Sequence, residues 1–140
     1  MRHTTALLFA ICWLGCEGTN EVINPGTLTF PLIVSLRAGE SIRLPQLGFI
    51  ARFDSVTSDS RCPQGAECVW QGDGATRISI LPDANQAVTC TLHTTLFPTL
   101  ILVNGAAVRL KELDPYPQLG AIMDQSVYIA VLEVNRTGIR

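Results

Sequence analysis

Short segments in which hydrophobic and polar residues alternate follow one another along most of this chain. In "FIARFDSV", Phe49, Ala51 and Phe53 share one face of an extended segment, while Arg52 and Asp54 share the other. Further segments of this kind are residues 27–36, 41–44, 75–81, 87–92 and 107–113. Their side chains expected to face a core are Ile42, Leu44, Thr76, Ile78, Ile80, Val88, Cys90, Leu92, Val108 and Leu110. A period of two indicates antiparallel strands with one face on a core and the other in water.

The last segment, "SVYIAVLEV" at residues 126–134, is apolar on both phases, which indicates a central strand. Gly, Pro, Asn and Asp separate the segments at the short intervals typical of sandwiches and barrels. We therefore predict an all-β fold, an antiparallel β-sandwich of about seven or eight short strands, as one domain at residues 27–140. A small β-barrel is the alternative, because the pattern does not define strand order. Neither architecture implies an activity.

The first fifteen residues have the order of parts of a secretory signal, with Arg2 before the apolar run Ala6–Leu14. This run is too short to cross a bilayer, which takes about 20 residues as a helix. "WLGC", which ends at Cys16, resembles a bacterial lipobox. That resemblance implies cleavage before Cys16, lipidation of its thiol and, with Glu17 next, delivery to the outer membrane. The alternative is an ordinary signal that leaves Cys16 as a plain thiol.

Residues 16–26 lack periodicity and contain chain breakers, so we predict a lipidated N-terminus and a flexible tether. The formal net charge of the whole chain is −2, and the basic residues are scattered. Nucleic-acid binding needs several cations on one surface, so this class of partner is excluded.

The segment "DSRCPQGAECVWQGDG" at residues 59–74 contains two of the cysteines and is the part of the chain richest in chemically distinctive residues. If Cys16 takes a lipid, three cysteines remain after the signal, and they can form one disulfide in three ways. Cys62 and Cys68 are the natural pair, because the proline and glycine between them let the chain double back. Cys90 lies on the apolar phase of its strand, and we expect an inert buried thiol there.

Patterns for metal binding or catalysis are weak. The C-x₅-C spacing is not that of a zinc site, and His93, the one histidine after the signal, is expected on the opposite strand face from Cys90. No C-x-x-C redox motif and no serine on a nucleophile elbow occurs. We therefore expect no metal, no cofactor and no enzymatic activity, although paired-carboxylate chemistry would leave no spacing signal.

Three residues are candidates for binding a partner. Trp70 either packs in the core over the disulfide or serves as an exposed aromatic anchor. Arg61 either pairs locally with Asp59 or offers its cation to a partner beside a rigid loop. Tyr116 lies between two prolines in "DPYPQLGAIMDQ", which either crosses a sheet end or displays Tyr116 as a contact surface.

Four motifs together resemble a group of small, uncharacterised bacterial lipoproteins. They are "DSRCP" (residues 59–63), "CVWQG" (68–72), "LKELDPYP" (110–117) and "VYIAVLEV" (127–134). The resemblance spans residues 44–136, and Gln71, Cys90 and Asp114 depart from the pattern. It implies a lipoprotein with a β-fold and carries no activity.

The functional expectation is a non-catalytic binding or structural module of the cell envelope. It would be a monomer held to the membrane by its lipid, with an envelope protein or a glycan as partner. The alternative is an inhibitor of extracytoplasmic peptidases that acts through the constrained loop "SRCPQGAEC" at residues 60–68.

Overall fold

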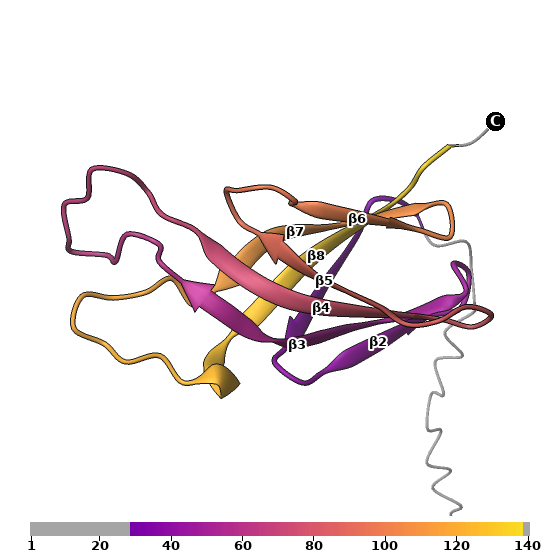
Figure 1. The fold of residues 1–140 in the computed structure, drawn as a ribbon, viewed down its shortest axis with the longest axis horizontal. Coiled ribbons are helices and arrows are strands. Elements are labelled where there is room, and N and C mark those ends of the chain that lie inside the picture. Colours follow the sequence, from indigo (N-terminus) through magenta and orange to yellow (C-terminus); the bar gives the residue numbers. More distant parts are fainter. Residues whose placement is uncertain (1–28, 139–140) are drawn as a thin grey trace, which may run out of the picture.

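Two antiparallel four-stranded sheets pack face to face in the computed structural model, which describes residues 29–138 (Figure 1). One sheet has the order β1-β8-β7-β6 and the other β2-β3-β4-β5. The strands are β1 (Leu32–Arg37), β2 (Ser41–Leu44), β3 (Phe49–Asp59), β4 (Gly74–Pro82), β5 (Val88–His93), β6 (Leu100–Val103), β7 (Ala106–Asp114) and β8 (Ile129–Arg136). A 3₁₀ turn, η1 (Gln125–Val127), precedes β8. The predicted all-β sandwich is confirmed, whereas the predicted signal, Cys16 and the tether to residue 26 lie outside the described residues.

The core lies between the two sheets and follows the alternation in the sequence. The largest fully buried side chains are Phe49, Phe53, Ile78, Ile80, Leu92, Leu132, Val108, Val134 and Thr76. One prediction was wrong in this respect, because Val88 is 44% exposed and Cys90 is only half-buried. β5 is an edge strand of its sheet, so its first residues meet solvent where the sandwich opens.

β8 lies between β1 and β7, which confirms the prediction of a central strand. β6 was not predicted, since its four residues are apolar without alternation. The sequence of the turn after β6 does indicate a β-hairpin. Asn104 and Gly105 both have positive φ, 47° and 69°, and an Asn-Gly pair between hydrophobic runs is typical of a two-residue hairpin turn.

The sandwich has two different ends (Figure 1). Short connections at residues 45–48, 83–87 and 104–105 form one end, here called the turn end. The longer segments 60–73, 94–99 and 115–128 form the other, here called the loop end. The described chain starts near the turn end, because Leu32 pairs with Val134 and Arg136 pairs with Ala106. Within residues 29–138 there is no helix with the length and hydrophobicity that crossing a membrane requires.

Candidate functional site at the loop end

A disulfide joins Cys62 and Cys68, with 5.9 Å between their Cα atoms, as predicted. The Cys62 amide donates to the carbonyl oxygen of Gln71 at 2.8 Å, and the Gln64 amide donates to that of Pro117 at 2.8 Å. Segments 60–73 and 115–128 are therefore tied to each other as well as closed internally. In the described chain Cys90 is a free thiol, and burial raises its pKa, which disfavours the reactive thiolate.

Arg61 pairs with Asp59 through both carboxylate oxygens. Its Nε lies 2.8 Å from Oδ1 and its Nη2 lies 2.7 Å from Oδ2, and the side chains are 5% and 9% exposed. Burial opposes ionisation of Asp59, but the hydrogen bonds and the charge of Arg61 outweigh it and lower its pKa. The Tyr128 hydroxyl donates to the same carboxylate at 3.0 Å. Burial and this contact raise the pKa of Tyr128 to about 12.

The same guanidinium holds the segment that follows β7. It donates to the carbonyl oxygens of Leu113 and, at 3.0 Å, of Pro115. It also lies 4.9 Å from the centroid of the Tyr116 ring, a cation–π contact. Arg61 thus pairs locally with Asp59, and because most of its N–H groups are occupied inside the protein, little of its hydrogen-bonding capacity is left for a partner.

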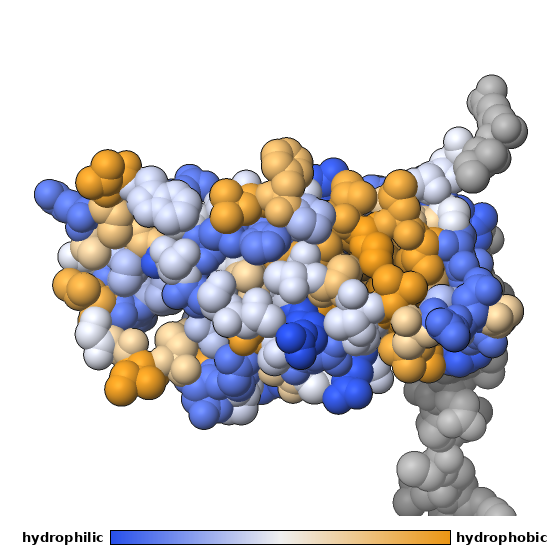
Figure 2. Space-filling view, viewed as in Figure 1, coloured by the Kyte–Doolittle hydropathy of each residue, from blue (hydrophilic) through white to orange (hydrophobic). Residues whose placement is uncertain are grey.

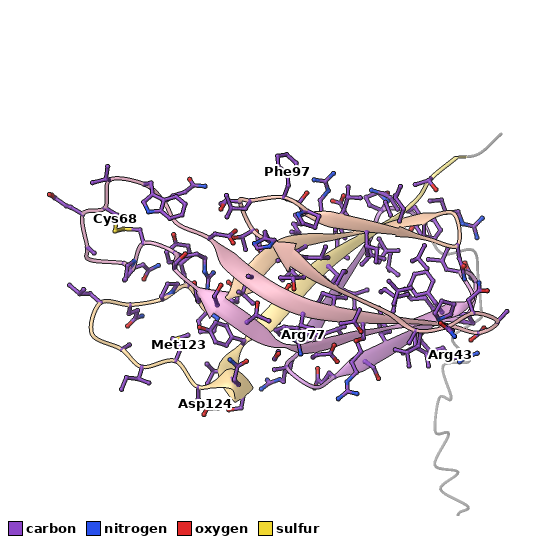
Figure 3. The ribbon with its side chains drawn as sticks, in the orientation of Figure 1. Arg43, Cys68, Arg77, Phe97, Met123 and Asp124 are labelled. Carbon is purple, nitrogen blue, oxygen red and sulfur yellow. A yellow bond between two sulfur atoms is a disulfide. The ribbon has the colours of Figure 1, made fainter. Side chains whose placement is uncertain are left out.

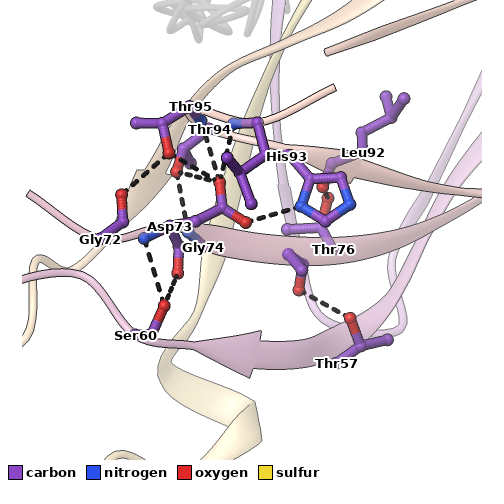
Figure 4. Close-up of polar contacts among 12 residues, drawn as sticks. Thr57, Ser60, Gly72, Asp73, Gly74, Thr76, Leu92, His93, Thr94 and Thr95 are labelled. Atoms are coloured by element: carbon purple, nitrogen blue, oxygen red, sulfur yellow. Dashed lines mark hydrogen bonds and ion pairs between the residues drawn. The ribbon is translucent and has the colours of Figure 1, made fainter. Parts of the chain in front are cut away.

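Asp73 organises the other side of the loop end (Figure 4). Its Oδ2 lies 2.6 Å from Nδ1 of His93, and its Oδ1 accepts from the amide and hydroxyl of Thr95, both at 3.0 Å. The Leu96 amide and the Thr94 hydroxyl lie 3.3 Å from Oδ1. This carboxylate therefore fixes the start of segment 94–99 by accepting from the amides of Thr95 and Leu96.

The charge of Asp73 is stabilised by these donors. Burial alone would raise its pKa, but the His93 hydrogen bond, the Thr95 and Leu96 amides and the Thr95 hydroxyl outweigh it and lower the pKa to about 2. Because the carboxylate is ionised, Nδ1 of His93 is the donor in this pair. In the described chain no hydrogen bond links His93 to a serine or cysteine, so the pair is not joined to a nucleophile.

The two glycines that flank Asp73 allow this arrangement. Gly72 has a φ of +73°, and a Cβ atom there would collide with the backbone carbonyl of Ser60. The chain passes this close because the Ser60 amide donates to the Asp73 carbonyl oxygen at 2.8 Å. The Gly74 amide donates to the Thr94 hydroxyl at 2.8 Å, where β4 begins.

A pocket of about 370 Å³ opens between these two networks. Among the side chains that line it are Arg61, Gln71, Thr95, Lys111, Glu112 and Tyr116. A β-bulge in β7 between Leu110 and Glu112 shapes one wall. The extra residue leaves both Lys111 and Glu112 exposed while Leu110 and Leu113 stay buried, which is how bulges re-aim side chains near functional sites.

Large hydrophobic side chains stand out from the loop end. Those with the greatest exposure are Val69, Trp70, Leu96, Phe97, Leu119 and Ile122. Figure 2 shows hydrophobic groups among polar ones at this end, and Figure 3 places Cys68 near its tip and Phe97 on its upper side. Trp70 is 60% exposed, so the interpretation as a core tryptophan is wrong. Residues 60–73 are a loop rather than a strand, so Trp70 has no core-facing phase.

The sequence named Arg61, Trp70 and Tyr116, and the structure places all three at the loop end, with Arg61 in contact with Tyr116. The sequence pattern did not indicate that Asp73, His93 and Thr95 form one hydrogen-bonded cluster. Their only linear signals are a carboxylate between two glycines and the polar run "HTT" at the end of an alternating strand. Among residues 29–138 no three His, Cys, Asp or Glu side chains gather where they could hold a metal ion.

No protein-family model matches this chain, and no curated protein or solved structure matches it significantly. The geometry of the loop end is therefore the feature from which a function can be inferred.

Proposed function

We propose that the protein is a lipid-anchored module of the bacterial cell envelope that binds a partner, without catalysis, through the loop end. One observation carries this proposal. Most of the exposed large hydrophobic side chains stand on the tied loops at the end of the sandwich opposite the start of the described chain. Exposed apolar side chains that cluster at one place, rather than being scattered singly, mark interaction surfaces of globular domains.

The tied loops suit recognition because binding then orders little additional chain. The disulfide closes segment 60–73, backbone hydrogen bonds join this segment to segment 115–128, and Asp73 fixes segment 94–99. A preorganised surface loses less entropy on association. Trp70 and Phe97, 60% and 90% exposed, offer aromatic side chains of the kind that dominate interface energetics.

The direction of the chain supports the anchored orientation. A lipid on Cys16 would reach the sandwich at its turn end, where Leu32 pairs with Val134. β3 has 11 residues, which at about 3.3 Å per residue span about 36 Å. The loop end would therefore stand away from the membrane, available to a partner in the envelope.

Anchoring is tested by Cys16→Ser in the native host, followed by fractionation and mass spectrometry of the N-terminal peptide. We expect the wild type in the membrane fraction with an acylated Cys16, and the variant unprocessed or released. The lipobox resemblance implies three acyl chains on Cys16. They hold a protein far more firmly than one chain does, since each buried CH₂ contributes about 0.8 kcal/mol. The anchor would be refuted if Cys16 of the wild type carried no lipid and the Cys16→Ser variant stayed in the membrane fraction to the same extent.

Partner binding is tested by placing a photo-crosslinking residue at Val69 or at Phe97 in the full chain, in cells. Arg43, at the turn end, is the matched control position (Figure 3). We expect one adduct from the loop-end positions, absent from position 43 and diminished by Trp70→Ala. Equal adducts from both ends, or none from the loop end, would contradict the assignment.

A second candidate function is inhibition of an extracytoplasmic peptidase. Val69, which directly follows Cys68 of the disulfide, has a fully exposed side chain, as a substrate-like loop requires. Assays of the full chain against a panel of serine and cysteine peptidases test it. Inhibition lost in Val69→Gly supports this function, and no inhibition at micromolar protein removes it.

A further inference from the structure

The pocket of about 370 Å³ at the loop end is a different feature from the exposed hydrophobic side chains around it. Its size is near the lower limit of ligand pockets, which are about 300–1,000 Å³, so it suits a small ligand or the end of a larger one. Three separate parts of the chain supply its walls: Gln71 and Gly72, Thr94 and Thr95, and the run from Lys111 to Asp114 with Tyr116. Neither Val69 nor Phe97 lines it.

Buried carboxylates hold these walls from outside the pocket. Asp73 fixes Thr94 and Thr95 through its Oδ1, and the Thr95 hydroxyl also lies 2.8 Å from the carbonyl oxygen of Gly72. Asp59 holds Arg61, which binds the carbonyl oxygens of Leu113 and Pro115. The shape of the pocket is therefore set before any ligand arrives, which lowers the entropy cost of binding.

The charge of the pocket argues against a strongly charged ligand. Arg61 lines it, but its positive charge is neutralised by Asp59 at 2.7 Å and its N–H groups are largely occupied. Lys111 is then the remaining cation of the lining, beside the carboxylates Glu112 and Asp114. An anion would meet two carboxylates and only one free ammonium group, so it is disfavoured, and the excess of a single negative charge attracts a cation only weakly.

The remaining groups match a polyhydroxyl ligand. Glu112 and Asp114 accept hydrogen bonds, Lys111 donates, and the Gln71 amide does both, while the Thr95 hydroxyl, whose hydrogen is donated inside the protein, can still accept. Hydroxyl groups of a sugar likewise donate and accept at once. Tyr116 adds a half-exposed ring, held by the guanidinium of Arg61 at 4.9 Å, on which the C–H face of a pyranose can pack.

We propose that this pocket binds a neutral saccharide, one or two pyranose rings at a time, with Tyr116 as the stacking surface and Glu112 as a hydroxyl acceptor. This inference rests on the proposed function only in that the loop end is the binding end. It names the ligand class of the pocket, whereas the exposed hydrophobic side chains serve a macromolecular partner.

The test is calorimetric titration of the full chain in a detergent without a sugar head group. The probes are N,N′-diacetylchitobiose, cellobiose and maltose, with inorganic phosphate and trialanine as charged and peptide comparators. We expect at least one disaccharide to bind with a millimolar or tighter Kd, and neither comparator to bind. Tyr116→Ala and Glu112→Ala should each weaken this binding about tenfold or more, equivalent to about 1.4 kcal/mol.

Two controls keep the result interpretable. Tyr116→Phe keeps the ring and should retain binding, and Glu112→Ala changes an exposed side chain that the fold does not need. Phe97→Ala should leave saccharide binding unchanged while it diminishes the loop-end photo-adduct. No disaccharide binding, binding of phosphate or trialanine instead, or unaltered binding in both pocket variants would overturn the inference. If the adduct from Val69 persisted in that case, the proposed envelope function would still stand.

Discussion

The guanidinium of Arg61 meets both carboxylate oxygens of Asp59, at 2.7 and 2.8 Å, in the interior of the loop end. The two residues are two positions apart in sequence, so this pair forms locally, yet it fixes parts of the chain that are distant in sequence. The Arg61 guanidinium also reaches the carbonyl oxygens of Leu113 and Pro115 and the ring of Tyr116. A local ion pair therefore sets the position of the segment that follows β7.

Arg61→Met should be strongly destabilising. It leaves the Asp59 carboxylate buried without its partner, and breaking a buried pair in this way costs about 3–5 kcal/mol of unfolding free energy. Urea unfolding monitored by circular dichroism measures the loss. Arg43→Met is the matched control, since Arg43 and Asp83 are 58% and 46% exposed and such pairs contribute about 1 kcal/mol or less.

The double variant Asp59→Asn with Arg61→Met provides the decisive comparison. Removing the unpaired charge should restore part of the stability lost in Arg61→Met alone. A double variant less stable than the single one would mean that Asp59 contributes through something other than this pair, such as its contact with Tyr128.

Gly72→Ala should lower the unfolding free energy by more than about 2 kcal/mol. A side chain costs about 1–2 kcal/mol in the left-handed region, and here its Cβ would also push against the Ser60 carbonyl. Comparison with Gly120→Ala isolates the second effect, because that variant has only the cost of the positive φ. Gly120 has a similar φ of +78° with nothing within 4 Å of an added Cβ. Equal losses in the two variants would show that the close approach to Ser60 contributes nothing.

Acid should weaken the fold through Asp73. Its pKa is 3.8 ordinarily and about 2 in the folded protein, so the ionised form contributes about 2 kcal/mol of stability above pH 3.8. This contribution is lost as the pH falls from 3.8 through 2. In that range Asp73 binds a proton in the unfolded state and not yet in the folded state, so acid favours unfolding. Urea unfolding between pH 2 and 7 measures it.

Asp73→Asn should remove this pH dependence. The variant should be less stable than the wild type at pH 7, with the difference narrowing below pH 4 as the wild-type carboxylate becomes protonated. A constant difference from pH 2 to 7 would assign the effect to packing rather than to the charge of Asp73.

Reduction of the Cys62–Cys68 disulfide should cost about 2 kcal/mol, the chain-entropy value for so small a ring. The unfolding free energy of the wild type should fall in dithiothreitol, while that of Cys62→Ser with Cys68→Ser should not respond. Cys90→Ala should respond like the wild type, and non-reduced peptides should show Cys62 linked to Cys68. A reductant effect that persists in the double variant would contradict this assignment.

The alternation of apolar and polar residues was sufficient to predict most of the fold. It located β3, β4 and β7 with their inward side chains, and apolarity on both phases identified β8 as central. Burial on a strand depends on a two-residue period that is visible locally. The disulfide was equally accessible, since only a proline- and glycine-containing turn lies between its cysteines. β6 was missed because four apolar residues carry no period.

The arrangement of the loop end could not be predicted from this local pattern. Asp73 meets Thr95, and Arg61 meets Tyr116, only because β4 pairs with β5 and because segments 60–73 and 115–128 cross at the same end of the sandwich. Strand order and loop crossing depend on contacts between residues far apart in sequence, such as Asp73 and Thr95, 22 positions apart, and such contacts leave no periodic trace. Local patterning therefore indicated which side chains face the core, whereas long-range packing buried Arg61, left Trp70 exposed and created the pocket that Arg61 lines.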